Sequence, residues 1–257
     1  MAEVVIVDSA EAAGELAADY ISSLVARKSD AVLGLATGSS PLAAYAALAR
    51  RNLDLSRVRG FALDEYIGID GTHPQSYRSV ITREVVEPLG LTAALVRVPG
   101  DDNGPLDGAG DRYEQDINSA GGIDLQILGI GRTGHIGFNE PGSSFGSTTR
   151  VKTLTQQTRQ DNSRFFGSLD EVPTHCLTQG IGTILRARHL FLFAFGASKA
   201  QAIASAVEGP LTASSPGSAI QLHPHVTVFV DTQAASELAN SDYYRQAFEQ
   251  RLDWEKI

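Results

Sequence analysis

The chain has 257 residues, of which 42% are hydrophobic and 20% are charged, and its formal net charge is −9. This composition suits one globular domain with a substantial core and excludes a disordered chain. The acidic balance argues against a nucleic-acid-binding protein, and any anionic ligand must be held by a local cluster of donors.

The cysteine content and the length of the apolar runs limit which disulfides, metal sites and membrane segments the chain can form. The only cysteine is Cys176, so one chain cannot build a disulfide framework or a cysteine-based zinc site. The first residues lack the basic start and long apolar core of a signal peptide, and no apolar stretch reaches membrane-spanning length. We therefore expect a cytoplasmic protein that binds no membrane.

Strands and helices alternate along the chain. Short apolar runs rich in β-branched or aromatic residues predict strands buried on both faces. The predicted strands are Val4–Val7, Ala31–Ala36, Val58–Leu63, Leu125–Gly129, His189–Phe195 and Val226–Val230. The predicted helices are Glu11–Arg27, Pro41–Arg50, Ser76–Val86, Gly110–Ala120, Lys199–Val207 and Ala235–Arg251. This alternation predicts a mostly parallel sheet with helices on both faces.

Two segments do not fit the alternation. Pro99–Gly110 is rich in Gly, Pro and Asp and is expected to be a surface loop. Residues 142–178 are polar and lack a clear strand run. The second segment is either a lid over a site or an irregular loop with a helix, because long loops in compact domains are often functional.

In an open α/β sheet, ligands bind beyond the carboxyl ends of the strands. Three of the predicted strands are followed there by residues that could bind or react with a ligand. The first is the run Thr37-Gly38-Ser39-Ser40-Pro41, which lies between a predicted strand and a predicted helix. Backbone amides, hydroxyls and the positive end of a helix favour a phosphate group. The alternative is an ordinary strand-to-helix turn with a serine cap.

The second strand end carries two adjacent carboxylates, Asp64 and Glu65. Neighbouring residues of a strand point to opposite faces, so only one of them can readily face a site. A carboxylate in that position can act as a general base with a tuned pKa. The alternative is a helix cap or an ion-pair partner.

The third strand end is a glycine-rich loop. Gly129, Gly131 and Gly134 match the dinucleotide-binding spacing, but Gly137 and Pro141 follow and resist helix formation. A nicotinamide enzyme is therefore an alternative that rests only on this spacing, since the dinucleotide motif must open a helix. The absence of a helix signal favours glycines that allow close approach to a small ligand. His135 and Glu140 are then a candidate acid–base pair, although a lone histidine is more often structural.

Nearly the whole chain resembles the glucosamine-6-phosphate deaminase family. The matching blocks are Thr37–Pro41, Leu63–Tyr66, His73–Arg78, Gly134–Ser144, Thr149–Thr155, Thr158–Phe166, Gly196–Ala200 and Ser218–Pro224. The resemblance implies a single domain over residues 1–257, with a modified Rossmann-like three-layer α/β/α sandwich, a mostly parallel sheet and a mobile lid at about residues 142–178. It also implies no nucleotide cofactor and no metal.

The reaction implied by the resemblance is conversion of glucosamine 6-phosphate and water to fructose 6-phosphate and ammonia. By resemblance, Asp64 moves a proton between C2 and C1 of the open-chain sugar. His135 opens the sugar ring and Glu140 works with it. The residues that resemble the phosphate clamp are Thr37, Gly38, Ser39, Arg164 and Lys199.

One catalytic position departs from part of the family. Some members place an aspartate two residues before the histidine, where this chain has Thr133, whereas other members also lack an acid there. The alternatives are a 6-phosphogluconolactonase, a deaminase for another amino-sugar phosphate such as galactosamine 6-phosphate, or a non-catalytic sugar-phosphate sensor. The sequence leaves open the preference at C4, homo-oligomerisation, and activation by N-acetylglucosamine 6-phosphate.

Overall fold

A seven-stranded sheet forms the centre of the molecule. The computed structural model describes residues 2–102 and 104–252. All neighbouring strands of this sheet run parallel. Their spatial order is β1 (Glu3–Val7), β10 (Val226–Asp231), β9 (Leu190–Ala194), β6 (Leu125–Gly129), β2 (Val32–Leu35), β3 (Arg59–Ala62) and β5 (Val96–Arg97). The predicted parallel sheet is confirmed, and only the two-residue strand β5 was missed because it is too short to show a pattern.

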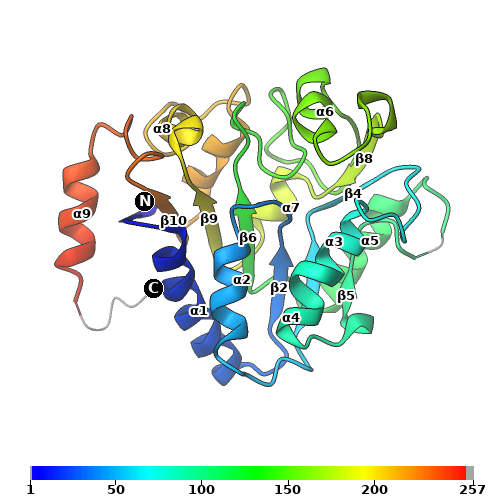
Figure 1. Ribbon diagram of the computed structural model, residues 1–257, viewed down its shortest axis with the longest axis horizontal. Helices are drawn as coiled ribbons and strands as arrows, with labels where there is room; N and C mark the ends of the chain where they lie inside the picture. The colour runs from blue at the N-terminus through cyan, green and yellow to red at the C-terminus, as the bar shows by residue number, and fades with distance from the viewer. Residues whose placement is uncertain (1, 103, 253–257) are drawn as a thin grey trace.

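Helices cover both faces of the sheet, which confirms the three-layer α/β/α sandwich. Helices α1, α2 and α4 lie on the face turned to the viewer, and α7 lies behind the sheet (Figure 1). The helices are α1 (Ala10–Arg27), α2 (Leu42–Ala49), α3 (Tyr77–Ile81), α4 (Glu87–Leu89), α5 (Ala109–Ser119), α6 (Gln156–Ser163), α7 (Ile181–Leu185), α8 (Ala200–Val207) and α9 (Ser241–Glu249). A π-helical turn (Thr82–Val86) joins α3 to α4, and 3₁₀ turns span Ala93–Leu95, Leu169–Glu171, Ala197–Lys199 and Pro216–Leu222.

The core lies between the sheet and the two helical layers. Phe191, Phe193 and Phe229 are among the largest fully buried side chains, and the rings of Phe193 and Phe229 stack with centroids 4.9 Å apart. Every residue of β9 is buried. Burial on both faces explains why these strands are continuous apolar runs rather than alternating patterns. Among the described helices, none has both the length and the apolar character needed to cross a bilayer.

The order of the strands reverses between β2 and β6. From β2 the chain proceeds outward through β3 to β5, and from β6 it proceeds the other way through β9 to β10. The loops that leave β2 and β6 therefore diverge, and such a switch point opens a crevice at the carboxyl edge of the sheet. The two loops lie against each other there, since a Cβ added at Gly129 would be 3.7 Å from Ser40 Cβ.

A second, antiparallel sheet stands above this edge. It has the order β4 (Asp64–Tyr66), β8 (His175–Thr178) and β7 (Arg150–Thr153). The expectation that residues 142–178 lack strands was therefore wrong, because β7 and β8 both belong to this segment. Residues of β7 alternate between half-buried and exposed positions, so its sequence gives no apolar run. Helix α6 connects β7 to β8 at the top of the view in Figure 1.

The other helix predictions hold with shifted ends. The predicted helix Ala235–Arg251 is shorter, since α9 begins at Ser241 after a series of turns. Helix α7 was not predicted because its five residues are fewer than the pattern needs. Turns fill the predicted loop Pro99–Gly110 until α5 begins at Ala109, apart from residue 103, which lies outside the described residues.

Glu114 of α5 ties the base of the small sheet to the main body. Its carboxylate accepts hydrogen bonds from Thr149 N at 2.8 Å and from Thr183 Oγ1 at 2.6 Å. It also forms an ion pair with Arg186. Gly110 allows this approach, since a Cβ there would lie 2.1 Å from the Thr149 carbonyl oxygen. The segment entering β7 is thereby fixed from one side by buried, charge-assisted hydrogen bonds.

Replacing Glu114 with alanine should lower the free energy of unfolding by about 2–4 kcal/mol, because the substitution leaves buried donors without an acceptor. Urea unfolding followed by circular dichroism measures this change. Gln115→Ala on the exposed side of the same helix is the matched control and should change the free energy by less than about 0.5 kcal/mol. Equal effects of the two substitutions would contradict the anchoring role of Glu114.

Candidate active site

The loop that follows β6 forms a compact turn rather than a helix. Gly131 N–H donates to the His135 carbonyl at 2.8 Å, and Gly134 N–H donates to the Gly131 carbonyl at 3.0 Å. Gly134 adopts a φ of +80°, which glycine tolerates without strain. Throughout the described loop from residue 130 to residue 141, no helix forms. The geometry therefore lacks the helix that a dinucleotide loop must open.

The imidazole of His135 lies directly over Gly131. A Cβ added to Gly131 would be 2.1 Å from His135 Cε1, so any other residue at position 131 would displace the ring. His135 is half-buried. The glycine spacing thus allows the loop to pack closely on its own histidine. This agrees with glycines that permit close approach and not with a nucleotide-binding loop.

Thr133 lies between His135 and Glu140. His135 Nδ1 is 2.9 Å from Thr133 Oγ1, and Thr133 Oγ1 is 3.3 Å from Glu140 Oε2. The direct distance from Nδ1 to Oε2 is 3.5 Å, which is long for a hydrogen bond. A hydroxyl can accept one hydrogen bond and donate another. The threonine therefore fits a relay in which Nδ1–H donates to the hydroxyl and the hydroxyl donates to the carboxylate.

Glu140 is buried, and its carboxylate is surrounded by donors. Its Oε1 accepts hydrogen bonds from Thr155 Oγ1 at 3.4 Å and from Thr158 Oγ1. Burial alone would raise the pKa of Glu140. The His135 imidazole and the hydroxyls of Thr158 and Thr133 outweigh burial and bring the pKa of Glu140 below its ordinary value. Glu140 is therefore held as an anion at neutral pH.

Asp64 stands at the start of β4, against the same loop. A Cβ added at Gly137 would be 3.5 Å from Asp64 Oδ2, so this carboxylate and the His135 loop are neighbours. Asp64 is only 6% exposed. Burial, and then the nearby charge of Glu65, raise the pKa of Asp64 to about 8. A buried carboxylate with such a pKa exchanges protons near neutral pH, as a general base must.

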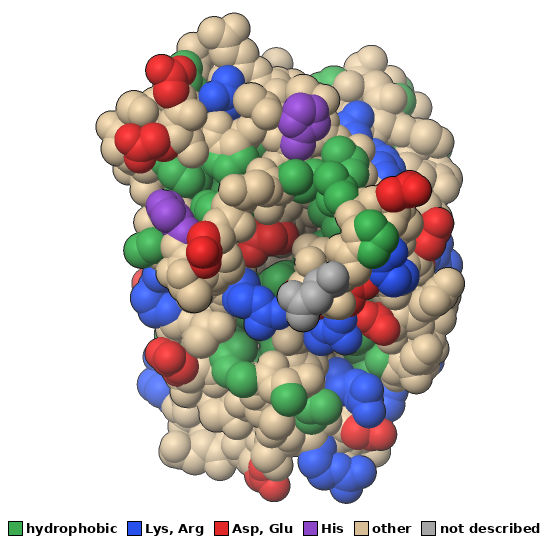
Figure 2. Space-filling model, turned by 90° about the vertical axis from the view of Figure 1, so that its right-hand side faces the viewer, with side chains coloured by type: hydrophobic (Ala, Val, Ile, Leu, Met, Phe, Trp, Pro, Cys, Tyr) green, Lys and Arg blue, Asp and Glu red, His purple; other side chains and the backbone are tan. Residues whose placement is uncertain are grey.

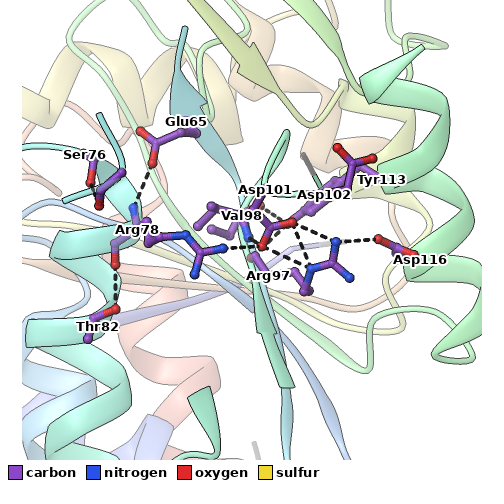
Figure 3. Close-up of polar contacts among 12 residues, drawn as sticks. Glu65, Ser76, Arg78, Thr82, Arg97, Val98, Asp101, Asp102, Tyr113 and Asp116 are labelled. Atoms are coloured by element: carbon purple, nitrogen blue, oxygen red, sulfur yellow. Dashed lines mark hydrogen bonds and ion pairs between the residues drawn. The ribbon is translucent and has the colours of Figure 1, made fainter. Parts of the chain in front are cut away.

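Glu65 points to the opposite side of β4 and has a structural role. Its carboxylate accepts hydrogen bonds from the backbone N–H groups of Tyr77 and Arg78, both at 2.9 Å, at the start of α3. Figure 3 shows the bond to Arg78, whose guanidinium pairs with Asp101. Of the two adjacent carboxylates, one therefore faces the site and the other binds a helix N-terminus, as the alternation of a strand requires.

A separate cavity lies on the Glu65 side of β4. It measures about 540 Å³ and opens in the hollow on the face seen in Figure 2. Its lining includes Glu65, Arg78, Asp101 and Leu177. Arg78 and Asp101 form an ion pair with each other, and the Glu65 carboxylate accepts hydrogen bonds from three backbone N–H groups. Among its described lining residues, Asp64, His135 and Glu140 are absent, so this cavity is distinct from the candidate site.

Positive charge gathers at the other end of the glycine-rich loop. Lys199, at the end of the 3₁₀ turn before α8, donates from Nζ to the Ile130 carbonyl at 2.6 Å. Burial lowers the pKa of Lys199, and the positive charges of Arg132 and Arg164 lower it further, partly offset by Asp161. Arg132 and Arg164 thus each lie within electrostatic range of Lys199, which makes this end of the loop a candidate site for an anion in an acidic protein.

The loop after β2 supplies backbone groups at the same crevice. Gly38 has a φ of +88° and is exposed, as is Ser39, while Thr37 is half-buried. The Tyr45 hydroxyl of α2 accepts from Ala36 N–H at 3.1 Å and fixes the start of this loop. Among the described residues, no hydrogen bond or ion pair joins Thr37, Gly38 or Ser39 to Lys199 or Arg164. The loop after β2 and the cations are linked through Ser40, Gly129 and Ile130 instead.

Sequence reasoning missed three residues of this arrangement. Arg132 was assigned no role, although its place inside the glycine-rich loop was a usable signal. Thr155 and Thr158 contact Glu140 from 15 and 18 positions along the chain. Nothing in the local pattern around Thr155 reveals that partner, because a threonine at that point is explained fully as the N-cap of α6.

Asp64→Asn should change how stability depends on pH. The folded pKa of about 8 lies above the ordinary aspartate pKa of 3.8, so between pH 4 and pH 8 the folded state holds a proton that the unfolded state releases. The free energy of unfolding of the wild type therefore falls as pH rises through this window. That of the asparagine variant does not fall in this way, because asparagine does not titrate. At pH 8 we expect the variant to be more stable by on the order of 1–3 kcal/mol.

Urea unfolding at pH 5 and pH 8 provides the measurement, with Asp30→Asn at an exposed aspartate as the control. A stability difference between Asp64→Asn and wild type that stays constant from pH 5 to pH 8 would show that Asp64 does not carry the shifted proton.

Comparison with known proteins places this geometry in a family. The family described as glucosamine-6-phosphate isomerases/6-phosphogluconolactonase matches residues 7–229. A glucosamine-6-phosphate deaminase of Bifidobacterium longum subsp. infantis is 58% identical, with 100% of both chains covered. One of Pseudarthrobacter chlorophenolicus is 54% identical, over 99% of this chain and 100% of that one.

Solved structures agree. A monomeric glucosamine-6-phosphate deaminase is 40% identical with a TM-score of 0.88, over 91% of this chain and 99% of that chain. The 6-phosphogluconolactonase of Trypanosoma brucei, 16% identical with a TM-score of 0.74 over 93% of this chain and 99% of that one, shares the fold. The chain therefore belongs to the glucosamine-6-phosphate isomerase/6-phosphogluconolactonase family.

Proposed function

We propose that this protein is a glucosamine-6-phosphate deaminase, which converts glucosamine 6-phosphate and water to fructose 6-phosphate and ammonia. The observation that carries the proposal is the buried carboxylate of Asp64 beside a histidine–threonine–glutamate chain at the switch point of the sheet. Full-length identity of 58% to a deaminase, against 16% to a structurally similar lactonase, supports the same choice within the family.

Ring opening is the first chemical task, because the C2 proton of the sugar is weakly acidic until C1 is a free aldehyde. His135 is suited to move a proton between the ring oxygen and O1, since imidazole exchanges protons near neutral pH. Thr133 holds Nδ1–H at 2.9 Å and leaves Nε2 for the substrate. The hydroxyl takes the place of the second acid found in some members of the family, and Glu140 supplies the negative charge behind it.

Isomerisation and deamination follow. The Asp64 carboxylate removes the proton from C2 to give an enolamine and returns a proton at C1, which leaves an iminium at C2. Water adds to C2, the C2–N bond breaks and ammonia departs, so the oxygen of water becomes the carbonyl oxygen of fructose 6-phosphate. Burial keeps the carboxylate basic enough for the first transfer, since its pKa is about 8.

The phosphate end of the substrate is assigned to Lys199, Arg164 and the loop Thr37–Ser39. Arg132 joins this set, because its charge acts on Lys199 as that of Arg164 does. A forked guanidinium suits phosphate oxygens, and an ammonium adds a point charge. Binding the remote phosphate orients the reacting carbons between Asp64 and His135.

The proposed lid within residues 142–178 has fixed ends. Strands β7 and β8 pair with each other, and β8 pairs with β4, which carries Asp64. The part free to open is therefore the connection from about residue 154 to residue 174, which includes α6. Asn162 of α6 donates to the Tyr66 hydroxyl at 2.9 Å, and the Phe166 ring packs on Tyr66. These contacts are suited to holding the lid closed over a sugar phosphate.

Incubation with glucosamine 6-phosphate should release ammonia and fructose 6-phosphate in equal amounts, and Asp64→Asn should abolish both. Enzymatic assays for each product give the measurement, and solvent deuterium should appear at C1 of the product. Lactone hydrolysis requires no transfer of a carbon-bound proton, so 6-phosphogluconolactone turnover without such exchange would favour the lactonase. Ligand-induced thermal stabilisation without ammonia would favour a sensor, and faster turnover of galactosamine 6-phosphate would favour the other epimer.

Lys199→Ala should raise KM for the sugar phosphate roughly 30- to 150-fold, which corresponds to about 2–3 kcal/mol for a charge-assisted contact. Steady-state kinetics at fixed ionic strength measure the change, with exposed Arg57→Ala as a control for lost positive charge. A rise in KM of less than about threefold would remove Lys199 from the phosphate site.

A further inference from the structure

The two oxygens of the Glu140 carboxylate contact different parts of the chain. Oε2 faces the glycine-rich loop, where Thr133 Oγ1 lies at 3.3 Å and His135 Nδ1 at 3.5 Å. Oε1 faces α6, where Thr158 Oγ1 donates to it and Thr155 Oγ1 lies at 3.4 Å. Glu140 therefore bridges the catalytic loop and the helix of the lid.

The hydroxyl proton of Thr158 is directed towards Glu140 by its surroundings. Thr155 is the N-cap of α6, and its oxygen accepts from Thr158 N–H at 3.1 Å. Its hydroxyl also lies 3.0 Å from Thr158 Oγ1. Thr158 is 5% exposed, and its single hydroxyl proton points to Glu140. A desolvated hydroxyl that donates to an anion makes a strong, directional hydrogen bond.

We propose that Thr158 is a positioning residue that orients Glu140 towards Thr133 and His135, so that α6 supplies part of the acid–base machinery as well as cover. If its Oε1 partners were lost, the carboxylate would be free to rotate about its last bond and leave the relay. This role rests on the proposed function, since orientation of Glu140 matters only if His135 transfers a proton.

The same helix also carries Arg164 at its C-terminal end. Eight helical residues span roughly 12 Å, so one short rigid element reaches from the Glu140 carboxylate towards the proposed phosphate site. The Thr158–Glu140 contact is already made without substrate, so α6 holds Arg164 near the proposed phosphate site while it holds Glu140.

Thr158→Val keeps the shape of the side chain and removes the hydroxyl, whereas Thr158→Ser keeps the hydroxyl. In the free protein, ¹³C NMR titration of the Glu140 carboxyl, assigned with Glu140→Gln, should give a midpoint roughly one pH unit higher in Thr158→Val and unchanged in Thr158→Ser. An unchanged midpoint in Thr158→Val would overturn the proposal. Thr158→Ala carries the same test if the valine variant does not fold.

Steady-state kinetics provide a second test of the role of Thr158. Thr158→Val should lower kcat for glucosamine 6-phosphate by roughly 10- to 100-fold with KM within threefold, the usual range for loss of an orienting contact. Thr158→Ser should stay within threefold of wild type, and a loss in Thr158→Ser equal to that in Thr158→Val would indicate a packing role instead. If wild type itself releases no ammonia, the proposed function fails, whereas the NMR titration still decides whether Thr158 positions Glu140.

Discussion

Parallel pairing between β2 and β6 is the interaction on which the candidate site depends. It joins Leu33 to Leu125 and Gly34 to Gln126, at the point where the strand order reverses. The loops that leave these two strands must then diverge, and the glycine-rich loop and the loop Thr37–Pro41 come to lie on the two sides of one crevice. The apolar pattern of the sheet thus fixes which polar residues meet.

The candidate site gathers positive charge in a protein whose net charge is negative. The net charge of −9 repels anions, yet the positive charges of Arg132 and Arg164 lie close enough to Lys199 to lower its pKa. The two key carboxylates are tuned in opposite directions by their surroundings. Burial keeps Asp64 basic, and hydroxyl and imidazole donors keep Glu140 ionised. Two groups of the same chemistry can therefore serve as proton acceptor and as fixed charge.

The small antiparallel sheet links the proposed lid to the candidate catalytic residues. Strand β4 carries Asp64 and pairs with β8, while Thr178 of β8 accepts a hydrogen bond from Phe138 N–H at 3.2 Å. The proposed lid is thus attached both to the strand of the proposed base and to the loop of His135. A helix attached in this way could cover a substrate while keeping its position relative to Asp64 and His135.

Long apolar runs and glycine spacing are local properties, so they are enough to predict the parallel sheet, most of its helices and the three strand ends that carry polar side chains. Among the candidate site residues, Asp64, His135 and Glu140 follow from these patterns, whereas Thr133 and Lys199 are proposed only from the family resemblance. The pairing of β4, β7 and β8 into a sheet could not be predicted, since short polar strands are stabilised by their partners rather than by their own pattern. The contacts of Thr155 and Thr158 with Glu140 also emerge only from the folded chain, because contacts between residues far apart in sequence arise when packing brings their segments together.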